Sequence, residues 1–569
     1  MSANRHNTSA LASANDLIQG LLKLGLQAAV VSPGSRNAPL MQALHTAGVH
    51  CVVALDERAA AHHALGMALA LGQPVAVCCT SGTAALNHGP ALAEADRVNL
   101  PLISLTADRP EGAADQWESQ TLHQTGVHSS HVRADFFWSP ATSEQGEQTL
   151  HAIGKALLSG PVHVNCPFSE PLYSSEPTET TVHSPQAFGI STPPMGQASP
   201  RAIDKLSNHV EAAHSAGSRI LLLGGTQPHE LQKESIAAWS KIAVVAGDST
   251  SGLGNVPAAI VATDRWMKGW MQSKRNWSAA HPDLIVTFGA PLLSKALRQQ
   301  LRTAPVQHIH IDPSGRTPEA FGPSVVGIEA PVDQALDAVA ERIRTQNLTA
   351  PEEACVWLSV WTDEEEQRRL AHPAALKSAP WSDLRAHAAL HEAQPKEWTL
   401  HLGNSTPVRY AQLFHQIDGN QPWSNRGVAG IDGCSSTAVG AALAGQKVTL
   451  ITGDLGFLYD GNAFIVDPLP TDLRVAVIHN GGGGVFRWLD GPQRTGLLHS
   501  HFEMRHGLQL RALCDLHGLE HQRVNDENGL KAALKGWWTP SDSPRLLEIC
   551  TPSEESADVY KAYMAAVSD

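Results

Sequence analysis

The stretch 453–486 limits what this chain can fold into more than any other part of the sequence. An apolar run, 449–452, leads almost directly to Asp454, and a second apolar run, 475–478, leads to Asn480. The spacing is that of one strand–helix–strand unit, so we expect two neighbouring parallel strands whose carboxyl ends carry these two side chains. That edge is where open α/β sheets bind their ligands.

Asp454 and Asn480 offer a carboxylate and an amide oxygen, which are hard donors suited to Mg²⁺ shared with a phosphate-bearing ligand. The glycines 481–484 that follow would let backbone groups approach such a ligand closely. Each residue alone has an ordinary explanation, because Asp after a strand is a common helix N-cap and Asn-Gly is a common turn. Both residues at one sheet edge, beside an entropically costly glycine run, favour a metal and phosphate site.

Similar strand ends recur along the chain. Continuous apolar runs alternate with helical segments, which is typical of parallel sheets covered on both faces. We therefore predict an α/β fold of three doubly wound domains with mainly parallel sheets, covering residues 1–185, 198–348 and 375–569. Between the domains we expect a Ser-, Thr- and Pro-rich linker over 174–200, a break over 346–353, a charged helix over 357–370 and a Pro-containing stretch over 371–380. Within the third domain a helix is expected over about 459–465.

Net charge and cysteine use limit the classes of function. The formal net charge is −14 over 569 residues, which argues against nucleic acid or an acidic membrane surface as a partner. The eight cysteines show no metal-ligand spacing, and we expect them to be reduced and buried, as in a cytoplasmic protein. Residues 1–16 lack the apolar core of a signal peptide, and no apolar run approaches the ~20 residues that span a bilayer.

Four arginines are expected at the ligand edge, each just after a predicted strand: Arg36, Arg109, Arg409 and Arg426. Any one of them alone is more typical of a surface ion pair. Four in an acidic protein are a stronger signal, because Arg binds carboxylates with two parallel hydrogen bonds. They indicate a substrate set that carries several carboxylates.

The Gly453–Asp454 pair with Asn480 one crossover later resembles the signature of thiamine-diphosphate enzymes. The resemblance implies that Asp454, Asn480 and the Gly482 carbonyl hold Mg²⁺, or Mn²⁺, against the cofactor diphosphate. It also implies that Glu57, which opens a predicted helix, hydrogen-bonds the aminopyrimidine ring; on its own, Glu57 could simply be a favourable acid in a first turn. Leu455 stands where many relatives have Gly, and His479 stands where a first Asn is usual.

The motifs around the four arginines, with 165–173 and 502–508, closely resemble one thiamine-diphosphate family, the 2-succinyl-5-enolpyruvyl-6-hydroxy-3-cyclohexene-1-carboxylate (SEPHCHC) synthases. The resemblance covers nearly the whole chain. It implies decarboxylation of 2-oxoglutarate and 1,4-addition of the resulting succinyl carbanion equivalent to isochorismate, in menaquinone or phylloquinone biosynthesis. It further implies a homo-oligomer, either a dimer or a dimer of dimers, with active sites between subunits.

The same resemblance assigns further positions residue by residue. Ala296 stands where some relatives have a second basic residue beside Lys295. Residues implied in catalysis or substrate contact are Glu57, Arg36, Arg109, Gln120, Lys295, Ser405, Arg409, Arg426 and Phe486. Residues implied in cofactor binding are Glu57, Ile431, Asp454, Leu455, Gly456, Asn480, Gly482, Gly483 and Val485.

Other interpretations stay open. Another thiamine-diphosphate decarboxylase or carboligase, such as an acetolactate synthase-like enzyme, would share the cofactor residues. A non-catalytic binding or scaffold protein could share the fold. His308 and His310 would lie on one face of a strand, but no third metal ligand is evident, and such alternation is usually packing. His62 and His63 point different ways on a helix and cannot chelate together.

Overall fold

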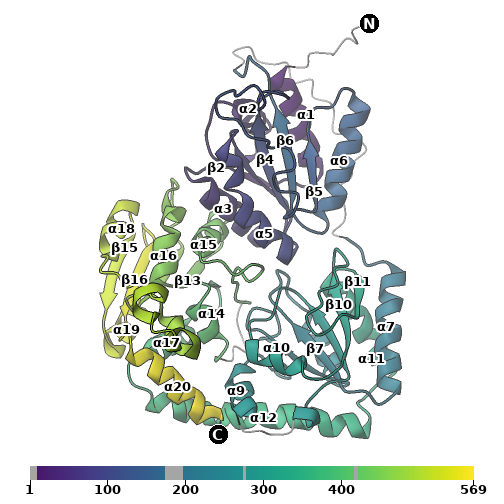
Figure 1. Cartoon of the computed structure of the whole chain (residues 1–569), viewed down its shortest axis with the longest axis vertical. Coiled ribbons are helices and arrows are strands. Elements are labelled where there is room, and N and C mark those ends of the chain that lie inside the picture. Colours follow the sequence, from purple (N-terminus) through teal and green to yellow (C-terminus); the bar gives the residue numbers. More distant parts are fainter. Residues whose placement is uncertain (1–8, 174–195, 273–276, 415–420, 569) are drawn as a thin grey trace. The chain divides into compact units, whose positions relative to one another are not determined.

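The computed structural model describes residues 9–173, 196–272, 277–414 and 421–568 (Figure 1). It contains three sheets of six, five and five strands, and every strand pair within them is parallel. This confirms the predicted α/β class with three doubly wound sheets. The chain forms two compact units: residues 1–196, 435–446 and 460–470 make the first, and the remaining residues make the second.

The first unit contains the six-stranded sheet, in the order β2-β1-β3-β4-β6-β5. Its inner strands β1 and β3 are buried along their whole length, and β4 and β6 are buried except at their last residue, as expected for continuous apolar sequences. The strands are β1 Ala28–Val31, β2 His50–Val53, β3 Val75–Cys79, β4 Leu102–Asp108, β5 Ala134–Phe137 and β6 Val162–Pro167. The helices are α1 Ala10–Lys23, α2 Ala38–Thr46, α3 Glu57–Leu71, α4 Thr83–Leu86, α5 Gly89–Val98 and α6 Ser143–Leu157.

Two short elements from the third α/β region belong to this first unit: most of α15 (Cys434–Leu443) and η2 (Gly461–Phe464). Helices α3 and α15 approach so closely that glycine is required at the contact. A Cβ on Gly66 would lie 2.0 Å from the Thr437 carbonyl oxygen, and one on Gly440 would lie 2.1 Å from the His63 carbonyl oxygen. Backbone therefore packs directly against backbone at this crossing.

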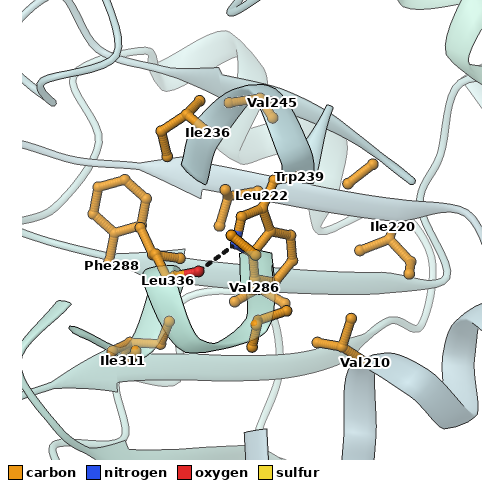
Figure 2. Close-up of a cluster of buried hydrophobic side chains, with 14 of the residues drawn as sticks. Val210, Ile220, Leu222, Ile236, Trp239, Val245, Val286, Phe288, Ile311 and Leu336 are labelled. Carbon is orange, nitrogen blue, oxygen red and sulfur yellow. Dashed lines mark hydrogen bonds between the residues drawn. The ribbon is translucent and has the colours of Figure 1, made fainter. Parts of the chain in front are cut away.

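The second unit holds the other two sheets. The central sheet has the order β11-β10-β9-β7-β8. Figure 2 shows its core, where the buried Trp239 indole donates a hydrogen bond of 3.1 Å to the Leu336 carbonyl. The strands are β7 Ile220–Gly224, β8 Ala243–Gly247, β9 Leu284–Phe288, β10 Gln307–Asp312 and β11 Val325–Glu329. The helices are α7 Pro200–Ser215, α8 Lys233–Trp239, α9 Asp264–Gln272, η1 Trp277–Ala279, α10 Lys295–Leu301 and α11 Val332–Thr345.

The third sheet has the order β12-β13-β14-β16-β15, and it carries the residues that opened the sequence argument. Its strands are β12 Thr399–Leu402, β13 Val448–Gly453, β14 Leu473–His479, β15 Glu520–Val524 and β16 Arg545–Cys550. Its helical elements are α13 Asp383–Ala393, α14 Thr406–Ala411, α16 Asp454–Tyr459, η3 Gly484–Trp488, α17 Asp490–Arg494, η4 Leu498–Phe502, α18 Leu510–His517, α19 Glu527–Leu534 and α20 Glu555–Ser568.

Two sequence expectations about helices are wrong in their bounds. The charged helix expected over 357–370 is longer: helix α12 runs from Glu352 to Ser378 and includes Pro373 and most of the expected Pro-containing stretch. Its buried tryptophans, Trp357 and Trp361, pack into the central sheet's core and both indoles donate to the Ala280 carbonyl. The helix expected over about 459–465 begins at Asp454 instead, ends at Tyr459, and is followed by the short turn η2.

The expectation about buried cysteines is correct only in part. The cysteines form no disulfide, but Cys51 and Cys355 are exposed and Cys550 is half-buried. No helix among the described residues is long and apolar enough to cross a membrane. The expected linker lies mostly outside the described residues, and the three domain ranges stay predictions.

Candidate active site

The register of the third sheet brings the two predicted metal ligands to one edge. Gly453, the last residue of β13, lies opposite Ile478 of β14. Asp454 follows β13 immediately as the first residue of α16, and Asn480 follows β14. Both side chains therefore leave adjacent strands at their carboxyl ends, which is the juxtaposition predicted from the sequence.

One carboxylate oxygen of Asp454 accepts no hydrogen bond from the described residues. Its Oδ1 accepts a hydrogen bond of 2.7 Å from the Leu455 amide. Its Oδ2 is buried and accepts no hydrogen bond from any described residue. A buried carboxylate oxygen without a donor is costly unless a cation or another donor meets it. The donor set fits the divalent metal that the sequence implied.

Asn480 is oriented by a carboxylate that sequence reasoning missed. Its Nδ2 donates a hydrogen bond of 2.9 Å to Asp383 Oδ2, and Thr551 Oγ1 donates one of 2.6 Å to Asp383 Oδ1. Asp383 is fully buried, and this burial raises the pKa of its carboxyl. Because the amide nitrogen faces Asp383, the amide oxygen is the Asn480 atom that can bind a metal, and it also accepts a hydrogen bond of 3.3 Å from the Gly482 amide. Asp383 lies almost a hundred residues earlier, and no spacing or motif pointed to it.

The glycine turn after Asn480 has the backbone shape that only glycine adopts easily. Gly481, Gly482 and Gly483 have φ values of +81°, +95° and +73°. A Cβ on Gly482 would lie 2.2 Å from the Met504 carbonyl oxygen, and one on Gly483 would lie 2.9 Å from Glu503 Cα. The turn is therefore pressed against the segment 502–508, which the sequence singled out only as a matching motif.

His479, whose role the sequence left open, belongs to an ionic cluster on β14, β16 and β15. Its Nδ1 lies 2.7 Å from Glu548 Oε1, and His521 Nε2 lies 2.7 Å from Glu548 Oε2. The Cys550 sulfur and the Glu548 carboxylate raise the pKa of His479 to about 9. Burial opposes ionisation of Glu548, but hydrogen bonds from His479 and His521 lower its pKa to about 2. A hollow of about 400 Å³ opens beside this cluster, lined by His479, Asn480, Gly481, Arg505, His506, Arg523, Cys550, Thr551 and Ser553.

Five further residues predicted to bind cofactor or substrate lie just after β13 or β14, or just before α15. Val485 and Phe486 lie in η3, where the Phe486 ring stands 5.6 Å from the Phe502 ring. Leu455 and Gly456 lie in the first turn of α16, and Ile431 is half-buried just before α15. Their roles toward a cofactor stay predictions.

Ser405 and the two arginines of this unit follow β12. Ser405 precedes α14 with φ +76°, a strained conformation that non-glycine residues adopt mainly at functional sites. Arg409 lies in α14. Arg426 Nη1 donates a hydrogen bond of 2.8 Å to Asn404 Oδ1. The expectation that every arginine follows a strand is wrong for Arg426, which follows only an isolated bridge between Trp423 and His401.

Two buried carboxylates of the central sheet face these arginines. Burial raises the pKa of Asp248 to about 7, and the charge of Arg426 opposes that rise. Burial likewise raises the pKa of Asp264, and the charge of Arg409 opposes it. Lys295, predicted to reach the site from the central domain, is exposed at the start of α10.

The remaining predicted residues lie in the first unit. Glu57 is the first residue of α3 and accepts a hydrogen bond of 3.3 Å from Asn87 Nδ2. Its neighbours fix the start of the helix, because the Asp56 side chain caps α3 and Arg58 Nη1 donates a hydrogen bond of 3.0 Å to Asp460 Oδ1. Helix α3 therefore presents Glu57 on a firmly held first turn.

Arg36 and Arg109 lie near each other at the carboxyl ends of β1 and β4. Arg36 is buried, and its Nη1 donates a hydrogen bond of 2.9 Å to the Phe168 carbonyl. Burial raises the pKa of the Asp108 carboxyl, and the positive charge of Arg36 opposes that rise. Arg109 Nε is buried without a hydrogen-bond partner among the described residues. Arg109 and Asp108 line a hollow of about 360 Å³.

Gln120 stands on the loop beside β3 with φ +58°, and its Nε2 donates 3.2 Å to the Ser81 carbonyl. Gly82 faces it closely, since a Cβ on that glycine would lie 3.1 Å from Gln120 Cγ. The first unit thus gathers one acid, two guanidinium groups and an amide at strand ends. The second unit gathers the metal-binding set and the other two guanidinium groups.

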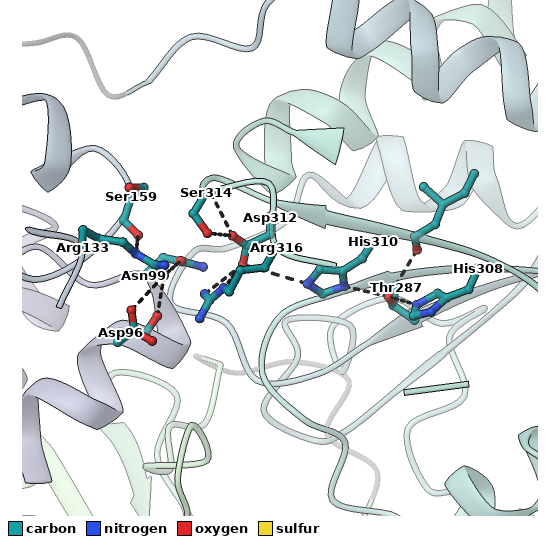
Figure 3. A network of polar contacts seen from close by, with 11 residues as sticks. Asp96, Asn99, Arg133, Ser159, Thr287, His308, His310, Asp312, Ser314 and Arg316 are labelled. Atoms are coloured by element: carbon teal, nitrogen blue, oxygen red, sulfur yellow. Dashed lines mark hydrogen bonds and ion pairs between the residues drawn. The ribbon is translucent and has the colours of Figure 1, made fainter. Parts of the chain in front are cut away.

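The two histidine pairs that the sequence dismissed as metal sites have ordinary partners. Figure 3 shows His308 and His310 sharing Thr287 Oγ1, at 2.7 and 2.8 Å. His62 Nδ1 contacts the Arg58 carbonyl, whereas His63 Nε2 contacts the Ala463 carbonyl. Neither pair offers two free nitrogens to one ion.

Comparison with known proteins gives the family. Residues 12–127 match the family described as "Thiamine pyrophosphate enzyme, N-terminal TPP binding domain". The whole chain resembles a solved structure, benzoylformate decarboxylase from Polynucleobacter necessarius, with a TM-score of 0.69, 16% identity and coverage of 95% of this chain and 99% of that one. The fold is therefore that of the thiamine-diphosphate enzymes.

Curated relatives narrow the class. SEPHCHC synthases from Christiangramia forsetii and Porphyromonas gingivalis are 32% and 33% identical, over 94% and 96% of this chain and 95% of each relative. The SEPHCHC synthase from Bacteroides thetaiotaomicron is 32% identical over 95% of this chain and 96% of its own length. The chain belongs to the SEPHCHC synthase family.

Proposed function

We propose that this protein is a thiamine-diphosphate-dependent transferase that decarboxylates 2-oxoglutarate and joins the remaining succinyl unit to isochorismate, giving SEPHCHC for menaquinone or phylloquinone biosynthesis. Family membership supports the proposal along the whole chain. The observation that carries it is local. A buried carboxylate oxygen of Asp454 has no hydrogen-bond donor among the described residues, and it lies at the same sheet edge as Asn480. The Asn480 amide oxygen faces away from Asp383 and accepts a hydrogen bond of 3.3 Å from the Gly482 amide.

Asp454, Asn480 and the Gly482 carbonyl would hold Mg²⁺ or Mn²⁺ against the cofactor diphosphate, since these oxygen donors suit both ions. When bound, thiamine diphosphate supplies the electron sink that makes loss of CO₂ from a 2-oxo acid possible. Glu57 would accept or share a proton with the aminopyrimidine ring. Ile431, Leu455, Gly456, Gly483 and Val485 would shape the remainder of the cofactor pocket.

The arginines would bind the carboxylates of two dicarboxylic substrates. Guanidinium groups bind carboxylates bidentately and keep their charge at every physiological pH, so they can fix orientation as well as attract. Arg409 and Arg426 belong to the unit that carries the metal ligands, whereas Arg36 and Arg109 belong to the unit that carries Glu57. Gln120, Ser405, Lys295 and Phe486 would complete the substrate contacts.

The proposed oligomeric state and the sharing of active sites between subunits are supported by the resemblance to the family. We propose a homodimer or a dimer of dimers, in which Glu57 of one subunit serves the metal site of its partner. A cytoplasmic location agrees with cysteines that form no disulfide.

The test is a reaction with both acids. Purified protein with thiamine diphosphate and Mg²⁺ should consume 2-oxoglutarate and isochorismate together, and mass spectrometry should find their adduct less CO₂. Turnover of pyruvate without isochorismate would instead indicate an acetolactate synthase-like activity. Absence of Mg²⁺-dependent thiamine diphosphate binding would indicate a non-catalytic protein.

The Glu57→Gln variant tests the proposed role of the Glu57 carboxyl group in proton exchange with the cofactor. The variant keeps the size of the side chain and can still contact Asn87, but it cannot exchange a proton, so turnover should fall by at least about a hundredfold. The far-ultraviolet circular dichroism and the melting temperature should match those of the wild type. Unchanged turnover would remove Glu57 from the mechanism.

A further inference from the structure

The segment 503–506 lies directly on the glycine turn, and its position has no role in the function proposed above. The Met504 carbonyl would clash with any Cβ at Gly482, and Glu503 Cα would clash with one at Gly483. The glycine turn therefore accommodates this segment as well as a cofactor. We call residues 503–506 the strap.

The strap is anchored by a buried carboxylate. The Glu503 side chain is fully buried and forms ion pairs with Arg487 of η3, with His499 of η4 at 3.0 Å and with Arg505 at 2.9 Å. Arg487 also donates to the Ser553 carbonyl. Two of these partners, Arg487 and His499, lie outside the strap, so the buried carboxylate ties the strap to η3 and η4.

The anchored strap positions His506 beside Asp454, at the proposed metal-binding edge of the sheet. The His506 side chain is 4% exposed, and its Nε2 lies 3.4 Å from Asp454 Oδ2 without forming a hydrogen bond to it. His506 Cδ2 would lie 3.4 Å from a Cβ on Gly482, so the ring lies between two of the proposed metal ligands. The His479 ring stacks against it, with centroids 5.3 Å apart.

The tautomer of His506 follows from its other nitrogen. The Leu508 amide donates to His506 Nδ1 at 3.4 Å, so Nδ1 is an acceptor and the proton of the neutral ring is on Nε2. Nε2–H is then a buried donor that has no acceptor among the described residues. A ring nitrogen that carries a proton cannot bind a metal, but it can donate to an anion beside the metal.

We propose that His506 is a cofactor ligand whose Nε2–H donates a hydrogen bond to an oxygen of the metal-bound diphosphate. The inference rests on the proposed cofactor site. His506 Nε2 lies 3.4 Å from Asp454 Oδ2, the oxygen that would hold the metal, so this buried N–H donor would lie beside the diphosphate that the metal binds. The strap, through Glu503, is the positioning device.

The experiment compares thiamine diphosphate binding by wild type, His506→Leu and His506→Gln, by calorimetry in excess Mg²⁺. Loss of a hydrogen bond to a charged oxygen should raise the Kd of His506→Leu by about tenfold or more. His506→Gln offers an amide N–H and should recover most of the affinity. Mg²⁺ with inorganic pyrophosphate should show the same order of variants, because the contact is with the phosphates.

The matched control is His501→Leu, an exposed histidine of η4 just before the strap, which should bind thiamine diphosphate like the wild type. The melting temperature of each cofactor-free variant separates a ligand from a packing role. Wild-type affinity in His506→Leu overturns the inference, as does a loss that spares pyrophosphate or that Gln does not restore. Failure of the wild type to bind thiamine diphosphate at all would instead overturn the proposed function.

Discussion

At the scale of single residues, the site depends on how its side chains are turned as much as on which residues are present. The Asn480 amide can face a metal with either end, and the Asp383 carboxylate selects the end by accepting from Nδ2. Partners behind a metal ligand typically change metal affinity by about 10–100-fold when they are removed. Asp383 is therefore a positioning residue for the proposed metal.

Asp383→Asn tests this. The new amide can donate to Asn480 as well as accept, so only the 3.3 Å hydrogen bond from the Gly482 amide would still favour the observed orientation of Asn480. We expect Mg²⁺ affinity, titrated by intrinsic fluorescence in the presence of thiamine diphosphate, to fall by about tenfold. The variant should still fold, because a neutral amide costs less to bury than a carboxylate.

Thr551→Val is the matched control, since Thr551 donates to the other oxygen of Asp383 and does not contact Asn480 in the hydrogen-bond network. It should weaken Mg²⁺ binding less than Asp383→Asn does. Equal affinity of Asp383→Asn and wild type would show that Asn480 is oriented by something else.

Asp312 of the central sheet gives a prediction about pH. It accepts hydrogen bonds from the Ser314 amide at 2.8 Å and from Arg316 Nη2 at 2.9 Å (Figure 3). Burial opposes its ionisation, but the Arg316 charge and these hydrogen bonds lower the pKa of Asp312 to about 2 from 3.8. The lowered pKa means that its contribution to stability is present above pH 3.8 and is lost as pH falls through 2.

The difference in pKa corresponds to roughly 2 kcal/mol of unfolding free energy at neutral pH. Asp312→Asn should therefore lower the unfolding free energy near pH 7, measured by urea titration, and should lose less stability than wild type between pH 4 and pH 2. Parallel pH profiles for the two proteins would contradict the assigned pKa.

At the scale of elements, glycine decides how closely helices pack. The Cβ positions of Gly66 and Gly440 both fall about 2 Å from backbone oxygens of the facing helix, and backbone cannot move aside as a side chain can. Gly66→Ala and Gly440→Ala should each destabilise the first unit by about 1–3 kcal/mol or more, as overpacking does. Gly461→Ala, where no heavy atom lies within 4 Å of the added Cβ, is the control and should be nearly neutral in thermal unfolding.

Sequence patterns predicted the strands and helices that are determined by residues close together in the sequence. Buried parallel strands need continuous apolar runs, so β13 and β14 could be located, and their ends placed Asp454 and Asn480 correctly. Helix α12 shows where local signals fail. The charged helix is expected to end at 370, before Pro373, but Ala375, just beyond the proline, packs into a buried cluster with Tyr410 and Tyr563, and the helix continues to Ser378. Tertiary contact outweighs the lost hydrogen bond.

Residues that act through contacts distant in sequence could not be predicted in the same way. Asp383 and Asn480 are joined only by the fold, and a lone Asp before a helical run looks like an ordinary N-terminal acid. His506 lay inside a recognised motif, yet nothing in its spacing shows that Glu503 and Arg487 fix it beside Asp454. Such positioning residues need three-dimensional coordinates because no periodicity encodes them.

At the scale of the whole molecule, metal, cofactor and stability should be coupled. A ligand that binds only the folded protein stabilises it by mass action, by about 2.7 kcal/mol at a hundred times its Kd. Thiamine diphosphate with Mg²⁺ should therefore raise the melting temperature, and a chelator added in excess should return it to the cofactor-free value. Stabilisation that persists after chelation would mean that the diphosphate is held without the metal.

The proposed assembly allows a sharper test, because each subunit would contribute half of two sites. In such a dimer, Glu57 of one chain serves Asp454 of the other. Glu57→Gln and Asp454→Ala homodimers should each be nearly inactive. A hybrid of the two variants, however, would pair the intact Glu57 of one chain with the intact Asp454 of the other at one of its two sites.

Subunit exchange in an equal mixture makes half of the dimers hybrid, so the mixture should recover about a quarter of wild-type turnover. Sites built within one chain would give no recovery, because every chain in the mixture carries a defect. Cross-linking the subunits before mixing should abolish the recovery, since it prevents exchange. The measured fraction therefore separates a site shared between subunits from one contained in a single chain, whether the assembly is a dimer or a dimer of dimers.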